Sequence, residues 1–193
     1  MERLNFNEWC DKLPKYLTDK EEHIAITICE KPTVGYCNDD FNKEYCDLNN
    51  IPYYNHHGDG GTIVMSEGSI ALGFIYNNRK YKRWMLSYLL ADLAKHLKTL
   101  GLAVTRDRND ILIDGYKVAS GCAINLKPDF KWTYEIIQIS INQDIEAIKN
   151  ICKKPMVKIP KGLSEYGITT ETIVNWCSNW LSVHLGIDAS VEL

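Results

Sequence analysis

The sequence lacks every segment that would indicate a membrane protein. No apolar run approaches the ~20 residues that a transmembrane helix needs. The stretch from Met1 to Leu17 mixes acidic and basic side chains and has no uninterrupted apolar segment of the kind found in signal peptides. The formal net charge is only −3, which argues against binding to nucleic acids or membrane surfaces through charge. We therefore expect a cytoplasmic protein with neither a membrane nor a nucleic acid as partner.

The seven cysteines lack the spacing of a metal site, because no two of them form a CxxC pair and their number is odd. Reduced thiols that serve mainly as small core residues are the simplest interpretation. Internal repeats, low-complexity tracts and long linkers are missing too. Together with the length of 193 residues, this predicts a single domain over residues 1–193.

The remaining composition, 45% hydrophobic and 24% charged, is that of a globular protein with a core. Strand-like alternation and helix-like periodicity follow one another irregularly along the chain. We expect strands at 23–30, 62–65, 69–76, 111–114, 117–125 and 132–141, and helices at 40–49, 80–100, 144–153 and 170–185. A hairpin turn is expected at Ser66–Gly68. Hairpins mixed with separate helices favour an α+β fold with a mostly antiparallel sheet flanked by helices.

A glycine-containing segment, residues 55–64 (NHHGDGGTIV), is the first candidate for chemistry. Gly60 and Gly61 directly precede an expected strand, where a backbone without side chains can approach a ligand and free amides can hold an anion. An ordinary surface turn is the alternative for this segment taken alone.

The second candidate is residues 108–121 (RNDILIDGYKVASG), which read as a strand, a turn and a strand. Such a hairpin is expected to place Lys117 opposite Asn109 and Asp110. A lysine and a carboxylate that face one pocket could clamp a phosphate and position a metal ion or a ribose. Taken alone, an exposed hairpin with a solvated lysine would explain the segment equally well.

Together these segments carry a resemblance to a known family. Residues 41–69 (FNKEYCDLNNIPYYNHHGDGGTIVMSEGS) resemble the "IPVVRRxSGGGAVYHDxGN" stretch of lipoate–protein ligases. Residues 108–121 resemble the "GRNDILVDGKKISGSA" stretch of the same ligases and the "NDVLLDGKKLAG" stretch of biotin protein ligases. Residues 158–186 resemble the "skGikSlxelgi" element and the closing helix. The sequence is therefore similar to the lipoate/octanoate/biotin protein ligase and transferase family.

This resemblance implies a catalytic domain with the fold of class II synthetases. It would use ATP and Mg²⁺ to activate lipoate, octanoate or biotin as an acyl-adenylate, and would transfer the acyl group to a lysine of a carrier domain. Lys117 matches the lysine that holds the acyl carbonyl and the α-phosphate, where negative charge develops. Asn109 and Asp110 match the pair near the nucleotide and the metal ion. The expected binding set is completed by His56, His57, Asp59, Gly60, Gly61, Thr62 and Gly121.

Several positions depart from the family pattern. His56 and His57 replace paired arginines, and a histidine is only partly charged at neutral pH. Asp59 replaces the first loop glycine, and Met65-Ser66 replaces a His-Asp pair. One extra residue follows Lys117, a spacing nearer to that of octanoyltransferases. Only residues 6–16 could supply the initial helix of the family, and the C-terminal accessory domain of larger lipoate ligases is not expected.

These departures leave two alternatives open. The first is an ATP-independent octanoyl or lipoyl transferase that carries the acyl group on a cysteine thiolate, for which Cys122 and Cys152 are the candidates. The second is a catalytically degenerate protein that uses the same fold to bind a ligand or a partner. Asp59 and the histidines at the place of the arginines favour this second alternative.

Overall fold

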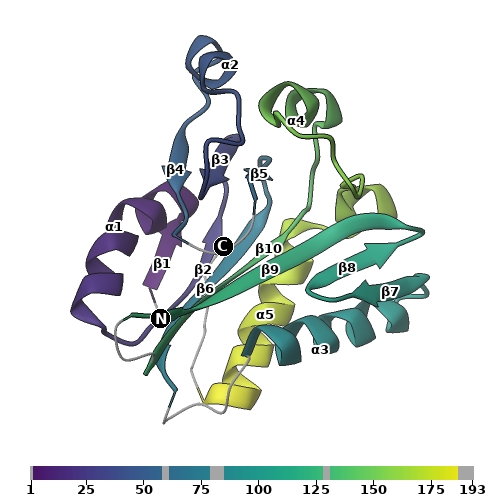
Figure 1. Cartoon of the computed structure of the whole chain (residues 1–193). Coiled ribbons are helices and arrows are strands. Elements are labelled where there is room, and N and C mark those ends of the chain that lie inside the picture. Colours follow the sequence, from purple (N-terminus) through teal and green to yellow (C-terminus); the bar gives the residue numbers. More distant parts are fainter. Residues whose placement is uncertain (1, 58–60, 79–84, 128–130, 187–193) are drawn as a thin grey trace.

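The centre of the fold is a seven-stranded sheet in which all neighbouring strands are antiparallel except the first two (Figure 1). The computed structural model describes residues 2–57, 61–78, 85–127 and 131–186. In spatial order the strands are β1 (Glu2–Asn5), β2 (His23–Ile28), β6 (Ile70–Asn77), β10 (Trp132–Ile139), β9 (Tyr116–Leu126), β8 (Asp110–Ile113) and β7 (Val104–Asp107). The predicted α+β class with a mostly antiparallel sheet is confirmed.

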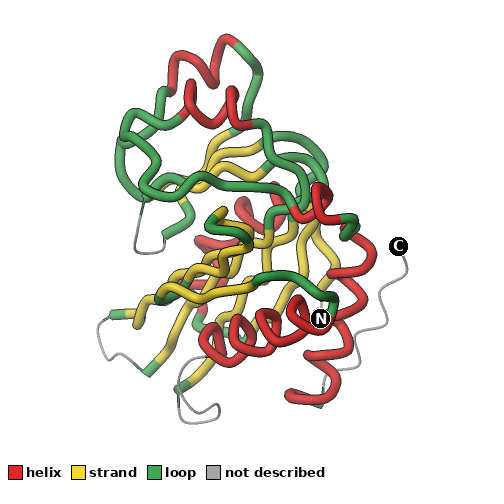
Figure 2. Tube along the Cα trace, turned by 90° about the vertical axis from the view of Figure 1, so that its right-hand side faces the viewer, coloured by secondary structure: helices red, strands yellow, loops and turns green. Residues whose placement is uncertain are grey.

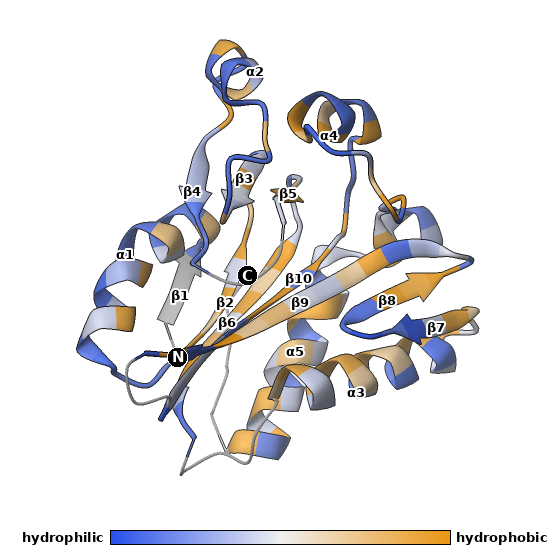
Figure 3. Cartoon of the chain, viewed as in Figure 1, coloured by the Kyte–Doolittle hydropathy of each residue, from blue (hydrophilic) through white to orange (hydrophobic). Residues whose placement is uncertain are grey.

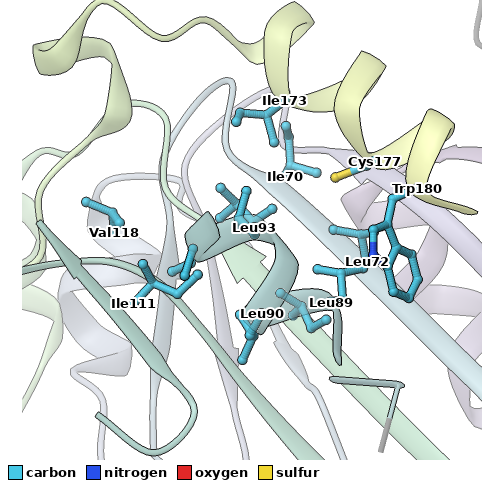
Figure 4. Packing of buried hydrophobic residues seen from close by; sticks show 14 of the residues in the cluster. Ile70, Leu72, Leu89, Leu90, Leu93, Ile111, Val118, Ile173, Cys177 and Trp180 are labelled. Carbon is cyan, nitrogen blue, oxygen red and sulfur yellow. The ribbon is translucent and has the colours of Figure 1, made fainter. Parts of the chain in front are cut away.

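Helices cover both faces of this sheet, because strands such as β6 carry apolar side chains on both faces. Its side chains alternate between faces, so Leu72 and Phe74 pack toward the helices α3 (Met85–Thr99) and α5 (Thr170–Leu185), while Ile75 packs toward α1 (Phe6–Asp19). Apolar residues therefore colour the strands and the inward side of α3 in Figure 3, and Figure 4 shows the packing between α3, α5 and the sheet. Packing against helices on both faces of the sheet therefore stabilises β6.

The ends of the helices follow local sequence signals. Asn5 caps α1, because its side chain accepts from the backbone of Glu8 while the Glu8 carboxylate accepts from the backbone of Asn5. Past α3, Gly101 adopts a φ of +83°, and past α5, Gly186 adopts a φ of +65°, as glycines that end helices commonly do. The helix expected at 170–185 is confirmed at both ends. Residues 80–84 of the helix expected at 80–100 lie outside the described residues.

A small three-stranded sheet stands over one end of the large sheet, together with two short helices (Figure 2). Its core is a separate cluster that includes Val34, Phe41, Cys46 and Ile148. The elements of this part are β4 (Tyr53–Asn55), β3 (Thr33–Tyr36), β5 (Ile63–Met65), α2 (Lys43–Leu48) and α4 (Ile145–Ile151). The two sheets enclose the space in which the candidate site lies.

The hairpin expected at Ser66–Gly68 was wrong. β5 pairs with β3 in the small sheet, whereas β6 pairs with β2 and β10 in the large sheet. The turn therefore connects the small sheet to the large sheet. Directly after it the chain pairs with the end of β2: the backbone N–H of Gly68 donates to Cys29 O at 2.8 Å, and the backbone N–H of Cys29 donates to Ser69 O at 2.9 Å. In the described part of the chain, no helix combines the length and apolar character needed to cross a bilayer.

Candidate functional site

A cavity of about 370 Å³ opens between the two sheets. Its floor comes from β9 and β10, one wall from residues 61–64, and the opposite wall from α4 and the segment that follows it. A hydrogen bond joins β10 to β5, because Gln138 Nε2 donates to Val64 O at 3.0 Å. The described lining residues are Asp40, Gly61, Thr62, Ile63, Val64, Asp110, Lys117, Ala119, Ser120, Gln138, Ser140, Gln143, Ile148, Cys152, Lys154, Pro155, Met156, Val157, Lys158 and Pro160. This volume lies within the range of small-ligand pockets.

Lys117 reaches the cavity from the tight β8–β9 hairpin. The turn residues Asp114 and Gly115 both have positive φ values, 52° and 83°. The expected pairing of Lys117 with Asn109 and Asp110 was wrong: Lys117 lies opposite Leu112, and Asp110 lies opposite Ser120. An irregularity between Ile111 and Leu112 shifts the register. Lys117 and Asp110 nevertheless line the same cavity.

The glycine segment faces Lys117 across this cavity. Gly61 and Thr62 line it, whereas Asp59 and Gly60 lie outside the described residues. A Cβ built on Gly61 meets no heavy atom within 4 Å, so packing does not require a glycine there. Thr62 Oγ1 is buried and has no hydrogen-bond partner among the described residues. Since buried hydroxyls are normally paired, Thr62 is a candidate to hydrogen-bond a ligand.

The two histidines lie behind the glycine segment. His56 is buried, and its Nε2 lies 3.2 Å from Gly61 O, so the protonated nitrogen donates to that carbonyl. Burial lowers the pKa of His56, which keeps its ring neutral near pH 7. His57 is exposed, with its backbone N–H bound to Asn55 Oδ1 at 2.8 Å. Neither histidine is among the described lining residues, so we assign His56 to support of the loop.

Asn109, Gly121 and Cys122 are also missing from the described lining of the cavity. Asn109 O accepts from the backbone N–H of Gly121 at 3.1 Å, which joins the residue before β8 to the middle of β9. Successive residues of a strand point to opposite faces, so Ser120 faces the cavity while Gly121 faces α3. Cys122 packs against the apolar cluster beneath α1.

Cys152 is the one of the two candidate nucleophiles that lines the cavity. Burial raises the pKa of its thiol, and the nearby Lys117 ammonium opposes that shift. Burial is the larger of the two effects, so the pKa of the Cys152 thiol is raised and the thiol is mostly protonated at neutral pH. A protonated thiol is a poor nucleophile for attack on an acyl group.

Two lysines that line the cavity, Lys154 and Lys158, were not predicted from the sequence. Lys154 Nζ lies 2.8 Å from Asp40 Oδ2, and Lys158 Nζ lies 2.5 Å from Asp110 Oδ2 and 2.7 Å from Asp107 Oδ2. Hydrogen bonding to both carboxylates raises the pKa of Lys158, and the same contact lowers the pKa of Asp107. The lysine-rich run KKPMVKIPK at 153–161 was the available signal.

These contacts bear on the expected Mg²⁺ site. Mg²⁺ usually binds through one or two carboxylates together with substrate phosphates. Here the Asp110 carboxylate already binds an ammonium group, and the described residues contain no cluster of three or more potential metal ligands. The residues as arranged do not fit a metal ion at Asp110.

Comparison with known proteins agrees with this geometry. The model of the "Lipoyl protein ligase A/B catalytic domain" family matches residues 22–185. A structure from the lipoylation system of Thermoplasma acidophilum, a bipartite lipoate protein ligase and its E2 lipoyl domain, superposes with a TM-score of 0.75 at 13% identity, covering 100% of this chain and 84% of that chain. Lipoate-protein ligase A bound with ATP gives a TM-score of 0.75 at 12% identity, covering 100% and 86%.

A third similar structure is P. falciparum LipL1 in complex with lipoate, with a TM-score of 0.68 at 14% identity, covering 100% of this chain and 63% of that chain. At these identities the superpositions establish the fold alone. No curated protein matches the sequence.

Proposed function

The chain belongs to the lipoyl protein ligase A/B catalytic domain family, and on that basis we propose that it is an acyl–protein ligase. It activates a lipoyl, octanoyl or biotinyl carboxylate with ATP and transfers the acyl group to a lysine of a carrier domain. One observation carries this proposal: Lys117 and the Gly61–Thr62 segment line one cavity. The ATP-bound and lipoate-bound proteins of the same fold support the two ligand classes.

In the first step, a carboxylate oxygen of the acyl substrate attacks the α-phosphorus of ATP, and the bond to pyrophosphate breaks. The acyl-adenylate forms and pyrophosphate leaves. Lys117 is placed for this step because, among the described residues, no carboxylate pairs with its ammonium group within 4.0 Å. Its charge is therefore available to the oxygens of the phosphate and the acyl carbonyl, on which negative charge increases.

In the second step, the neutral amine of the carrier lysine attacks the acyl carbonyl. The new amide bond forms, AMP leaves with the electrons of the carbonyl–phosphate bond, and the amine loses a proton. The E2 lipoyl domain that accompanies the T. acidophilum ligase supports a carrier domain as the partner.

The test is formation of acyl-adenylate by the purified protein with ATP, Mg²⁺ and each of lipoate, octanoate and biotin. We expect Lys117→Ala to lower the rate by about 100-fold or more, as loss of one charge-stabilising donor commonly does. Lys95→Ala is the matched control, because Lys95 is an exposed lysine on α3 paired with Asp92. Adenylate formation by Lys117→Ala at the wild-type rate would contradict the role of this lysine.

The ATP-independent transferase remains a second candidate, since Cys152 lines the same cavity as Lys117. That reaction would move the octanoyl group from a carrier thioester to the Cys152 sulfur, with release of the carrier thiol. Incubation with octanoyl-carrier protein, followed by intact mass spectrometry, separates the two candidates. The ligase proposal expects no acyl adduct on wild-type protein, and an adduct lost in Cys152→Ser would favour the transferase. If neither reaction occurs but lipoyl-adenylate analogues raise the melting temperature, the protein is a binding module of this fold.

A further inference from the structure

Two carboxylates and one ammonium group form a compact ionic cluster, of which Asp110 and Lys158 line the cavity. Asp107 and Asp110 lie directly opposite each other across the β7–β8 hairpin. Lys158 Nζ lies between them, 2.7 Å from Asp107 Oδ2 and 2.5 Å from Asp110 Oδ2. The side chains of Lys158 and Asp110 are only 24% and 22% exposed, so solvent screens this pair less than a surface ion pair.

The backbone on both sides of Lys158 holds the ammonium group at this place. Upstream, the backbone of Cys152 forms an isolated antiparallel β-bridge with Phe41, and the backbone N–H of Lys153 donates to Asp40 O at 3.1 Å. Downstream, the backbone N–H of Lys117 donates to Ile159 O at 2.9 Å, and the backbone N–H of Lys161 donates to Lys117 O at 2.9 Å. The segment is therefore fastened to the strand that carries Lys117, which brings the two ammonium groups to the same cavity.

Two neighbouring carboxylates repel each other and any phosphate that approaches them, so a cation that offsets their charge favours the binding of an anion nearby. A divalent metal with one or two carboxylate ligands is a common solution, and a lysine is another. From the cluster geometry, we propose that Lys158 is a resident cation that takes the place of a divalent metal at Asp107 and Asp110 and offsets half of their negative charge, which lowers the repulsion that the anionic group of the ligand meets beside Lys117. The proposal deepens the proposed function and rests on it for the identity of that ligand.

The first experiment probes the cluster without any nucleotide, by following the binding of Mn²⁺ to the full chain through the EPR signal of the free ion. Wild-type protein is expected to bind Mn²⁺ weakly. Lys158→Met keeps the length of the side chain but removes its charge, so two carboxylates are left without a cation. Its affinity for Mn²⁺ should rise by at least about 10-fold. Asp110→Asn in the Lys158→Met background should remove the gain.

Lys154→Met is the matched control, because Lys154 lies on the same segment but pairs with a single carboxylate, that of Asp40. It removes one positive charge from the cavity and should not create a Mn²⁺ site. Circular dichroism verifies that each variant is folded. The proposal is overturned if wild-type protein binds Mn²⁺ as tightly as Lys158→Met, if folded Lys158→Met gains nothing, or if Lys154→Met gains as much.

The second experiment measures ATP binding by calorimetry in EDTA and in Mg²⁺. Wild-type protein should bind ATP in EDTA with an affinity within about 3-fold of that in Mg²⁺, whereas Lys158→Met should need the metal for tight binding. A 10-fold or larger metal requirement of wild-type protein would overturn the role of Lys158 toward the ligand. If the Mn²⁺ results are as expected but wild-type protein binds no ATP under either condition, the resident cation stands and the proposed ligase function fails.

Discussion

Replacing Gly121 with alanine separates a structural role of this residue from the ligand-binding role that the sequence resemblance implies. A Cβ at Gly121 would overlap Leu86 Cδ1 and would lie 2.9 Å from Ile136 O and 3.3 Å from Ile137 Cγ1. The leucine terminus can rotate away, but Ile136 O belongs to the backbone of the central strand β10 and cannot move without disturbing the sheet. Overpacking of this kind costs about 1–3 kcal/mol.

For a chain of this size, about 2–4 °C of melting temperature is lost for each kcal/mol, so Gly121→Ala should melt about 2–12 °C below wild type. Urea denaturation followed by tryptophan fluorescence gives the free energy of unfolding. Gly61→Ala is the matched control, because a Cβ there meets nothing within 4 Å and the residue lines the cavity. It should retain stability and lose ligand affinity. The reasoning is refuted if Gly121→Ala is as stable as wild type but fails to bind ligand.

Two further predictions concern one buried and one partly buried titratable group. Burial raises the pKa of the fully buried Glu135, so the folded state favours its protonated form, and stability is lost as pH rises through that raised pKa. The unfolding free energy of wild type should therefore fall, relative to that of Glu135→Gln, as pH rises above the ordinary pKa of a glutamate, and a difference that is constant with pH would contradict this. Because burial also raises the pKa of Cys152, iodoacetamide should alkylate it more slowly than free cysteine at pH 8, as judged by mass spectrometry against Cys152→Ser.

The elements that the sequence predicted best are those with long, regular patterns. Residues 170–185 repeat apolar side chains over several helical turns and end before a glycine, and the observed helix has the same bounds. The strands β3 and β4 have only four and three residues, TVGY and YYN, which is too short for an alternation to stand out. The hairpin error has the same origin: the pattern of 62–76 predicts two strands and a turn but does not say which sheet each strand joins.

The site was predictable where one local segment carries it. Lys117 and Gly61 each belong to a segment with a family resemblance, and both line the cavity. The pairing of Lys117 follows from the two-residue turn at Asp114 and Gly115, which sets Ile113 opposite Tyr116 and Leu112 opposite Lys117. The irregularity between Ile111 and Leu112 changes only the pairs farther from the turn, and no residue type in the sequence indicates it. Lys158 lies 48 positions from Asp110, and only the tertiary fold brings them together.

The positions of positive charge around the cavity differ from those that the family resemblance implies at 56 and 57. The resemblance places arginines at these two positions, but here His56 is buried with a lowered pKa and hydrogen-bonds Gly61 O. Lys154 and Lys158 line the cavity with Lys117, but both are paired with carboxylates, whereas in the described part of the chain no carboxylate pairs with Lys117. His56 instead supports the glycine segment, and the anion site that we propose draws its positive charge from Lys117.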